Sequence, residues 1–193
     1  MPTTSLSLLD RLRDDDQSSW RKLTELYTPL IRNWLARGGA PPQEIEDLTQ
    51  NVMAVVVRRV PEFQCGQREG SFRRWLRTIA VNCLREFWKS RQRRTQSPGG
   101  SDFQQMLDEL ADPNSGLSRQ WDEEHDQVVT RRLLDWIRPQ FQNTTWRAFE
   151  RVAIGGESPD EVARALGMTV NAVFIAKSRV LAKLREEGKG LIE

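Results

Sequence analysis

The stretch that decides the fold is SPDEVARALGMTVNAVFIAKSRVLAKLREE, residues 158–187. Ser158, with Glu161 three places on, is the signature of a capping box at the start of a helix. Gly167 supplies the left-handed residue that ends this helix, and Thr169 can cap a second one. Two short helices around a Gly-containing turn predict a helix-turn-helix, which lays the start of its second helix in the DNA major groove. The alternative is an ordinary helical hairpin in a core, and the upstream sequence decides between the two.

Length and composition allow a small helical protein with a modest core. The chain has 193 residues, of which 38% are hydrophobic and 29% charged, and this suits one or two small domains. No apolar run approaches the roughly 18 residues of a bilayer-spanning helix. No secretory signal is visible at the N-terminus, so we expect a cytoplasmic protein without membrane insertion. Cys65 and Cys83 match no metal or redox spacing, which favours free thiols.

Net charge is only +2, but it is unevenly distributed. Residues 1–95 carry 17 basic and 11 acidic residues, residues 96–125 carry 1 and 7, and residues 126–193 carry 11 and 9. A basic block, an acidic connector and a mildly basic block indicate two modules that meet polyanions, joined by a segment that does not. Chance clustering on solvated faces is the alternative.

Apolar residues at helical spacing predict the helices of the first module. Ser18 or Ser19 can cap a helix that runs to about Arg37, where two glycines end it. The next segment, residues 44–60, is rich in valine and has strand propensity. Its apolar residues nevertheless step at three and four, so we predict a helix here as well.

The same spacing predicts the longest helix, which is capped by Ser71 and ends near Arg94. Two later helices are expected over 123–140 and 144–154. Between them and the long helix, a segment rich in Gly, Pro, Ser and Asp is typical of a flexible linker, with room for a short helix around 103–110. The chain is thus predicted to be all-α, as two small helical modules joined by a flexible acidic linker. The expected boundaries are 1–95, 96–120 and 121–193.

Two helix faces carry patterns that a core does not need. The polar residues of the valine-rich helix line up on one side, as a solvent surface or a protein-docking face: Asp47, Gln50, Asn51, Ala54 and Arg58. The long helix is strongly basic at its end, with Phe87 and Trp88 inside the cluster Arg85, Lys89, Arg91, Arg93 and Arg94. Cations bind phosphates and aromatic faces stack on bases, so this cluster favours nucleic acid over a merely solvated face.

Enzymatic chemistry is not indicated. The single histidine, His125, lies in an acidic helical stretch, where a structural or solvated role is far commoner than catalysis. The sequence has no Gly-rich phosphate loop, no metal-spaced cluster and no nucleophile with an evident base. We therefore expect no catalytic residue, no metal and no cofactor.

The order of these motifs resembles that of bacterial RNA polymerase sigma factors of the sigma-70 family, in particular the short, two-domain extracytoplasmic-function (ECF) subfamily. The resemblance covers about residues 5–95 and 121–187. It rests on DLTQNV (Asp47–Val52), the P-x-F after it (Pro61–Phe63), the helix FRRWLRTIAVNCLREFWKSRQRR and the helix-turn-helix. It implies a region 2-like domain, a region 4-like domain, and a role in promoter recognition and transcription initiation.

The resemblance also implies partners. Core RNA polymerase is expected to bind through its β′ clamp and β flap, with Asp47, Gln50, Asn51 and Arg58 docking on the β′ coiled coil. Promoter DNA and an anti-sigma factor are the other expected partners. The acidic linker is expected to thread toward the active-site cleft and the RNA exit path, where negative charge mimics RNA.

The DNA-binding residues implied by the resemblance fall into two sets. The −10 set, with a flipped base held in the loop, is Gln64, Gln67, Arg68, Asn82, Arg85 and Lys89. The −35 set is Thr169, Asn171, Phe174, Ile175, Ser178 and Arg179. Phe174 and Ile175 stand where many relatives have a basic residue and a serine. Contact with a thymine methyl group is one expectation for Phe174, and packing in the core is the other.

Two other classes of protein fit parts of the sequence. One is a stand-alone helix-turn-helix regulator that binds duplex DNA as a dimer, and the other is an interaction protein whose helices serve as a docking scaffold. The polar stripe and the basic helix favour a sigma factor over the regulator, since a simple repressor needs neither. A sigma factor is expected to bind promoter DNA weakly alone and tightly with core polymerase.

Overall fold

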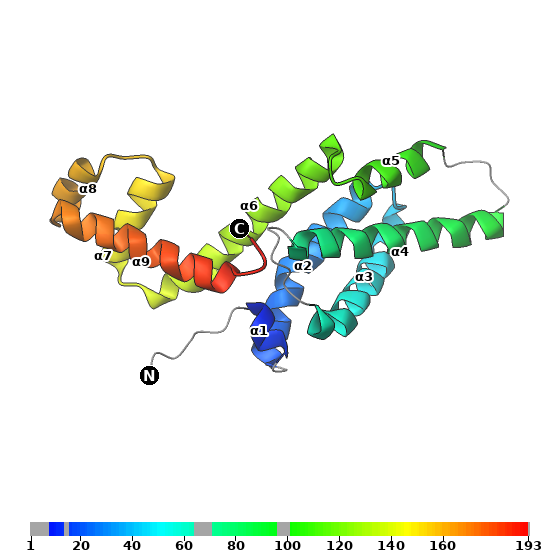
Figure 1. Cartoon of the computed structure of the whole chain (residues 1–193), viewed down its shortest axis with the longest axis horizontal. Coiled ribbons are helices and arrows are strands. Elements are labelled where there is room, and N and C mark those ends of the chain that lie inside the picture. The colour runs from blue at the N-terminus through cyan, green and yellow to red at the C-terminus, as the bar shows by residue number, and fades with distance from the viewer. Residues whose placement is uncertain (1–7, 14–15, 64–70, 96–100, 193) are drawn as a thin grey trace.

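The computed structural model describes residues 8–13, 16–63, 71–95 and 101–192. Within these ranges it is helical and contains no strand, which confirms the predicted all-α fold. The α-helices are α1 (Leu8–Arg13), α2 (Gln17–Arg37), α3 (Ile45–Arg59), α4 (Ser71–Thr95), α5 (Ser101–Ala111), α6 (Gly116–Ile137), α7 (Asn143–Phe149), α8 (Pro159–Leu166) and α9 (Val170–Gly188). Helices α1 to α5 gather at one end, α7 to α9 lie at the other, and α6 runs between them (Figure 1).

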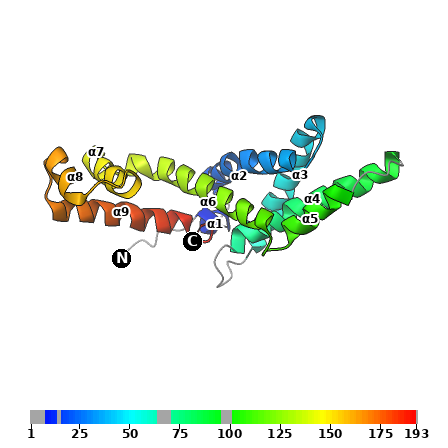
Figure 2. The same ribbon diagram turned by 90° about the horizontal axis from the view of Figure 1, so that it is seen from above.

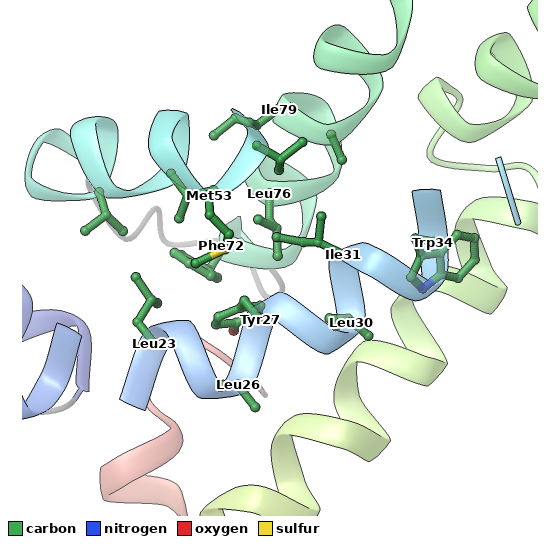
Figure 3. Close-up of a cluster of buried hydrophobic side chains, with 14 of the residues drawn as sticks. Leu23, Leu26, Tyr27, Leu30, Ile31, Trp34, Met53, Phe72, Leu76 and Ile79 are labelled. Atoms are coloured by element: carbon green, nitrogen blue, oxygen red, sulfur yellow. The ribbon is translucent and has the colours of Figure 1, made fainter. Parts of the chain in front are cut away.

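Helix α2 lies at the centre of the first module. Its buried face comprises Leu23, Leu26, Tyr27, Leu30, Ile31, Trp34 and Leu35. Met53 of α3 and Phe72 and Leu76 of α4 pack in the same cluster (Figure 3). The rings of Tyr27 and Phe72 lie 5.4 Å apart between their centroids. This packing fixes α3 and α4 against α2 and leaves their remaining faces outside.

The start of α2 differs from the prediction. The sequence suggests Ser18 or Ser19 as the cap, but the helix begins at Gln17 and is capped by Asp16. The Ser18 backbone N–H donates to Asp16 Oδ1 at 3.1 Å, and the Ser19 hydroxyl donates to Asp16 Oδ2 at 2.6 Å. A carboxylate at the positive end of the helix dipole is the stronger acceptor. The hydroxyls of Ser19 and Ser18 lower the pKa of Asp16 to about 2.

The valine-rich segment is a helix, as its spacing predicts. Val52 and Val56 of α3 are fully buried, and the polar residues Asp47, Gln50 and Asn51 are exposed. Burial of one helical face outweighs the strand propensity of valine because packing contributes more than intrinsic preference. The short turn after α3, Val60–Glu62, contains Pro61 and ends the helix.

The described part of the segment predicted as a linker is helical, and it includes the short helix expected around residues 103–110. Helix α5 starts at Ser101, and α6 starts at Gly116, capped by Ser115, rather than near residue 121. Leu107 and Leu110 of α5 are buried in the core of the first module. The acidic segment therefore packs on the first module, with α5 beside α4 (Figures 1 and 2).

Helix α6 belongs to both modules. Along most of its length, at Trp121, Val129 and Leu133, it is buried in the core of the first module. Near its end, Ile137 packs with Trp146, Phe149 and Val180 in a core of the second module. A continuous helix of 22 residues thus joins the modules across the boundary that the sequence predicts at residue 120.

The end of the chain returns to the first module. Glu187 of α9 forms an ion pair with Arg11 of α1, with Oε2 2.8 Å from Nη2. Leu191 is fully buried in the first module's core. Gly188 is required for this return, because a Cβ there would lie 2.8 Å from Cγ1 of Ile192. The second module is therefore held at both ends, by α6 and by this C-terminal contact.

Candidate functional site

The helix-turn-helix has the caps that the sequence predicts. The Glu161 backbone N–H donates to Ser158 Oγ at 3.3 Å, and the Ser158 N–H donates to Glu161 Oε2 at 3.2 Å, which completes the capping box. Gly167 has φ +64°, in the left-handed region. Thr169 Oγ1 accepts a hydrogen bond from the Ala172 N–H at 3.1 Å and caps α9. Helices α8 and α9 meet at 103°, within the range of helix-turn-helix motifs.

One face of α9 is buried and the other is open. Val173, Ala176 and Val180 are buried against α7 and α8. The exposed face carries the whole predicted −35 set: Thr169, Asn171, Phe174, Ile175, Ser178 and Arg179. Phe174 and Ile175 are 51% and 49% exposed. Phe174 is therefore not a fully buried core residue, although about half of its surface is covered in the free protein.

A charged clamp fixes the turn before α8. After α7 the chain makes one π-helical turn, Glu150–Ile154. Arg151 Nε donates to Glu157 Oε1 at 2.8 Å, and a second hydrogen bond joins the same two side chains. The hydrogen bond from Arg151 lowers the pKa of Glu157. The clamp holds the approach to α8 and with it the orientation of α9.

The polar stripe of α3 is exposed as predicted and forms one wall of a groove. Asp47, Gln50, Asn51 and Arg58 are all exposed. Between α3 and α4 lies a groove of about 800 Å³. Its α3 wall comprises Asp47, Asn51, Ala54 and Arg58, and its α4 wall comprises Cys83, Glu86, Phe87, Ser90 and Arg91. Gln50 does not line it. The α4 wall could not be found from the sequence, because nothing local shows that this side of α4 faces α3.

Of the two cysteines predicted to be free thiols, the structure describes one. Cys83 is a free thiol half-buried in the groove, and burial raises its pKa. Cys65 lies outside the described residues.

A second face of α4 carries the part of the −10 set that the structure describes. Asn82 and Lys89 are exposed, and Arg85 is half-buried. Arg74, Arg77, Thr78, Asn82 and Arg85 line a smaller pocket of about 240 Å³ whose far side is Leu110, Ala111 and Pro113. Gln64, Gln67 and Arg68 lie outside the described residues, as do the side chains of Arg93 and Arg94.

The arginines of α4 are paired with carboxylates of α5 and α6, which the sequence does not reveal. Arg85 Nη2 lies 2.8 Å from Asp108 Oδ1. Arg77 Nη1 lies 2.9 Å from Asp122 Oδ1 and donates to the Ser118 carbonyl at 3.2 Å. Arg73 forms an ion pair with Asp126 at 2.6 Å. Arg77 is only 4% exposed, and burial lowers its pKa from the ordinary value.

His125 is structural, one of the two roles expected for it. It is fully buried, with Nε2 3.2 Å from the Tyr27 hydroxyl and Nδ1 3.0 Å from Asp126 Oδ1. Burial lowers the pKa of His125. Burial acts to raise the pKa of Asp126, but the hydrogen bond with His125 and the charge of Arg73 outweigh it and lower that pKa. The histidine thus joins α6 to α2 in its neutral form.

The described residues bear on metal binding and on membrane insertion. Among these residues, no group of three or more His, Cys, Asp or Glu side chains could hold a metal ion. No single described helix is long and apolar enough to cross a membrane. Taken together, α8 and α9 have the length and composition, but they are bent at the helix-turn-helix.

The fold therefore defines an all-α protein with a grooved, basic N-terminal module and a C-terminal helix-turn-helix. Residues 23–94 match the family model of sigma-70 region 2. This range begins in α2 and ends in α4, so it contains the α3 stripe and both faces of α4. This part of the first module therefore matches sigma-70 region 2, in agreement with the resemblance that the sequence predicts.

The other comparisons add less. A search of curated proteins finds no match. Among solved structures, a chain in the structure of CnrH in complex with the cytosolic domain of CnrY is 18% identical. That alignment covers 92% of each chain, with a TM-score of 0.38.

Proposed function

We propose that the protein is a cytoplasmic sigma factor of the ECF type, which binds core RNA polymerase and directs it to promoters. One observation carries this proposal: a sigma-70 region 2 shares the chain with a helix-turn-helix whose second helix exposes one continuous reading face. A region 2 alone fits a docking module, and a helix-turn-helix alone fits a simple regulator. Their combination fits promoter recognition at two separate DNA elements.

The groove between α3 and α4 is the proposed docking site for the β′ clamp. A helix is about 10 Å across with its side chains, and the groove has an apolar floor of Leu48 and Val55 on which such a helix can rest. Its walls carry both signs of charge, with Asp47 and Glu86 against Arg58 and Arg91. Mixed charge above an apolar floor fits an amphipathic coiled-coil helix.

The α4 face around Asn82 is the proposed −10 contact. Asn82 and Lys89 are both exposed and lie about two turns apart on this face. Arg85 lies between them, about one turn from each. Lysine and arginine here bind phosphates, and the asparagine amide can pair with a base edge. The unpaired −10 strand would also meet the loop with Gln64, Gln67 and Arg68, which the resemblance assigns to the flipped base.

Helix α9 is the proposed −35 reader. Asn171 can pair with an adenine edge, Arg179 with a guanine edge or a phosphate, and Phe174 can contact a thymine methyl group. The exposure of these three side chains supports this role. The second module would also contact the β flap. An anti-sigma factor is a further proposed partner, carried by the family resemblance alone.

Charge reversal in the groove tests the docking step. We expect Asp47→Arg with Asn51→Arg to abolish co-purification with core polymerase, because two new cations enter a groove that already holds Arg58 and Arg91. Glu46→Arg is the matched control, since it makes the same reversal on the same helix at an exposed position outside the groove. Glu46 has only a long, exposed ion pair with Arg32, at 3.8 Å, which contributes little.

Three outcomes are informative. Loss of core binding in the double variant and retention in Glu46→Arg support the proposed site. Retention in both variants shows that the docking surface lies elsewhere. If the unmodified protein does not bind core polymerase and instead binds duplex DNA tightly as a dimer, the chain is a stand-alone regulator.

A further inference from the structure

We infer that Asp108, Asp122 and Asp126 form an autoinhibitory cover over the arginine face of α4, which must lift before this face can bind nucleic acid. The inference rests on the proposed function, because it takes this face to be the promoter-phosphate contact. The cover is defined here as α5 together with the first three turns of α6. It carries the acidic excess of the segment between the two modules.

The ion pairs show how the cover engages α4. Arg73 and Arg77 stand one turn apart on α4, and Arg85 follows about two turns later. Arg85, Arg77 and Arg73 pair with Asp108 at 2.8 Å, Asp122 at 2.9 Å and Asp126 at 2.6 Å, in that order. All three carboxylates come from the cover, and none comes from the helices of region 2 itself. Three guanidinium groups that are suited to phosphates are thus occupied by the protein's own anions.

The cover also closes one side of the basic pocket. Leu110, Ala111 and Pro113 form the wall opposite Arg74, Asn82 and Arg85. A base or phosphate that entered this pocket would meet the end of α5. The pocket and the predicted −10 residues therefore share a boundary with the cover, and a DNA strand cannot occupy the whole face while α5 stays in place.

The attachment of the cover is uneven along its length. Asp108 and Arg85 have side chains that are 58% and 30% exposed, and an ion pair of this exposure is weak because water screens it. The inner side chains of the cover, Leu107, Leu110 and Trp121, are buried and hold it to the core. The outer edge, at Asp108, is thus the part that a competing polyanion can displace first.

The reach of the molecule gives an independent reason for opening. The −10 and −35 elements lie about 25 base pairs apart, or roughly 85 Å of duplex at 3.4 Å per pair. Helix α6, with 22 residues, is only about 33 Å long at 1.5 Å per residue. The C-terminal contact of Glu187 and Leu191 keeps α9 beside the first module. Helix α6 alone therefore spans less than half of this distance, and its release from α4 would let the two modules move further apart.

Removal of one carboxylate tests the cover. The variant is Asp108→Asn, and the matched control is Glu109→Gln. Glu109 is the next residue and is exposed, and it forms no ion pair with the described residues of α4, so the control removes the same charge without touching the cover's contact. The probe is a fluorescein-labelled single-stranded DNA, and the readout is its anisotropy with the free protein at low salt. An exposed ion pair contributes up to about 1 kcal/mol. Its loss frees Arg85 and should raise the affinity for the single-stranded DNA by up to about fivefold. We expect this increase in Asp108→Asn beyond any change in Glu109→Gln.

A double-mutant cycle shows whether Asp108 acts through Arg85. In an Arg85→Gln background, Asp108→Asn should have no more effect than Glu109→Gln, because the arginine that it occupied is gone. Equal affinities of Asp108→Asn and Glu109→Gln, or an increase that persists without Arg85, would overturn the cover. With core polymerase bound, Asp108→Asn should transcribe as the unmodified protein does, since the cover has already lifted. Unmodified protein that fails to transcribe with core polymerase refutes the proposed function instead.

Discussion

Replacing Phe174 with alanine separates base reading from core packing. Phe174 is 51% exposed, so about half of the contact area of a core phenylalanine is there to lose. A fully buried Phe→Ala change costs about 3–5 kcal/mol, and we therefore expect Phe174→Ala to cost about 1.5–2.5 kcal/mol. Phe149, buried in the same module, is the matched control. Phe149→Ala should lose the full 3–5 kcal/mol, or roughly twice as much.

The decisive assay is transcription from a promoter library with core polymerase, at a temperature where both variants are folded. If Phe174 touches a base, Phe174→Ala changes which −35 sequences are used. Phe149→Ala should leave the −35 profile unchanged, because it acts only on the folded fraction. An unchanged −35 profile in Phe174→Ala, or a loss of stability as large as that of Phe149→Ala, would refute the assignment of this side chain to base reading.

Four further predictions rest on the electrostatics and packing of the described residues. Lys89→Gln should reduce the slope of log affinity against log salt by about one for the holoenzyme on promoter DNA, since one phosphate contact is lost, and an unaltered slope would count against it. The pKa of His125 is lowered by folding, so its contribution to stability is complete above its unfolded pKa of about 6.5 and is lost as pH falls below it. Denaturant unfolding across a pH series should show this loss, and His125→Gln should not. The pKa of Asp16 is lowered to about 2, so its contribution to stability persists to more acidic pH and is lost as pH falls from its ordinary pKa of 3.8 to about 2. Leu191→Ala should cost about 2–5 kcal/mol, because this side chain is fully buried, and a variant with unchanged unfolding would show that the C-terminal contact does not form in solution.

The helix-turn-helix could be predicted in detail because its signals are local. Ser158, Glu161, Gly167 and Thr169 act on backbone groups within three or four residues of themselves, and each does so in the structure. The exposed stripe on α3 was predictable for the same reason, since a helical period fixes which side chains share a face. The cap of α2 was missed only because Asp16, a stronger acceptor, precedes the two serines.

The cover on α4 could not be predicted, because its contacts join residues far apart in the chain. Arg73 and Asp126 are 53 positions apart, and Arg11 and Glu187 are 176 apart. Composition alone does not show that α5 packs on the first module, because breakers such as Pro98 and Pro113 flank a short amphipathic helix and dominate the average over the segment. The α4 half of the docking groove was hidden for a related reason, since only tertiary packing turns that side of α4 toward α3.

Run-off transcription with purified core polymerase tests the central claim most directly. The unmodified protein should give promoter-specific transcripts from a promoter library, and the transcripts should depend on sequences at both −10 and −35. Promoter DNA should be bound weakly by the free protein and tightly by its complex with core polymerase. Tight, specific binding of duplex DNA by the protein alone, with no transcript when core polymerase is added, would contradict the account.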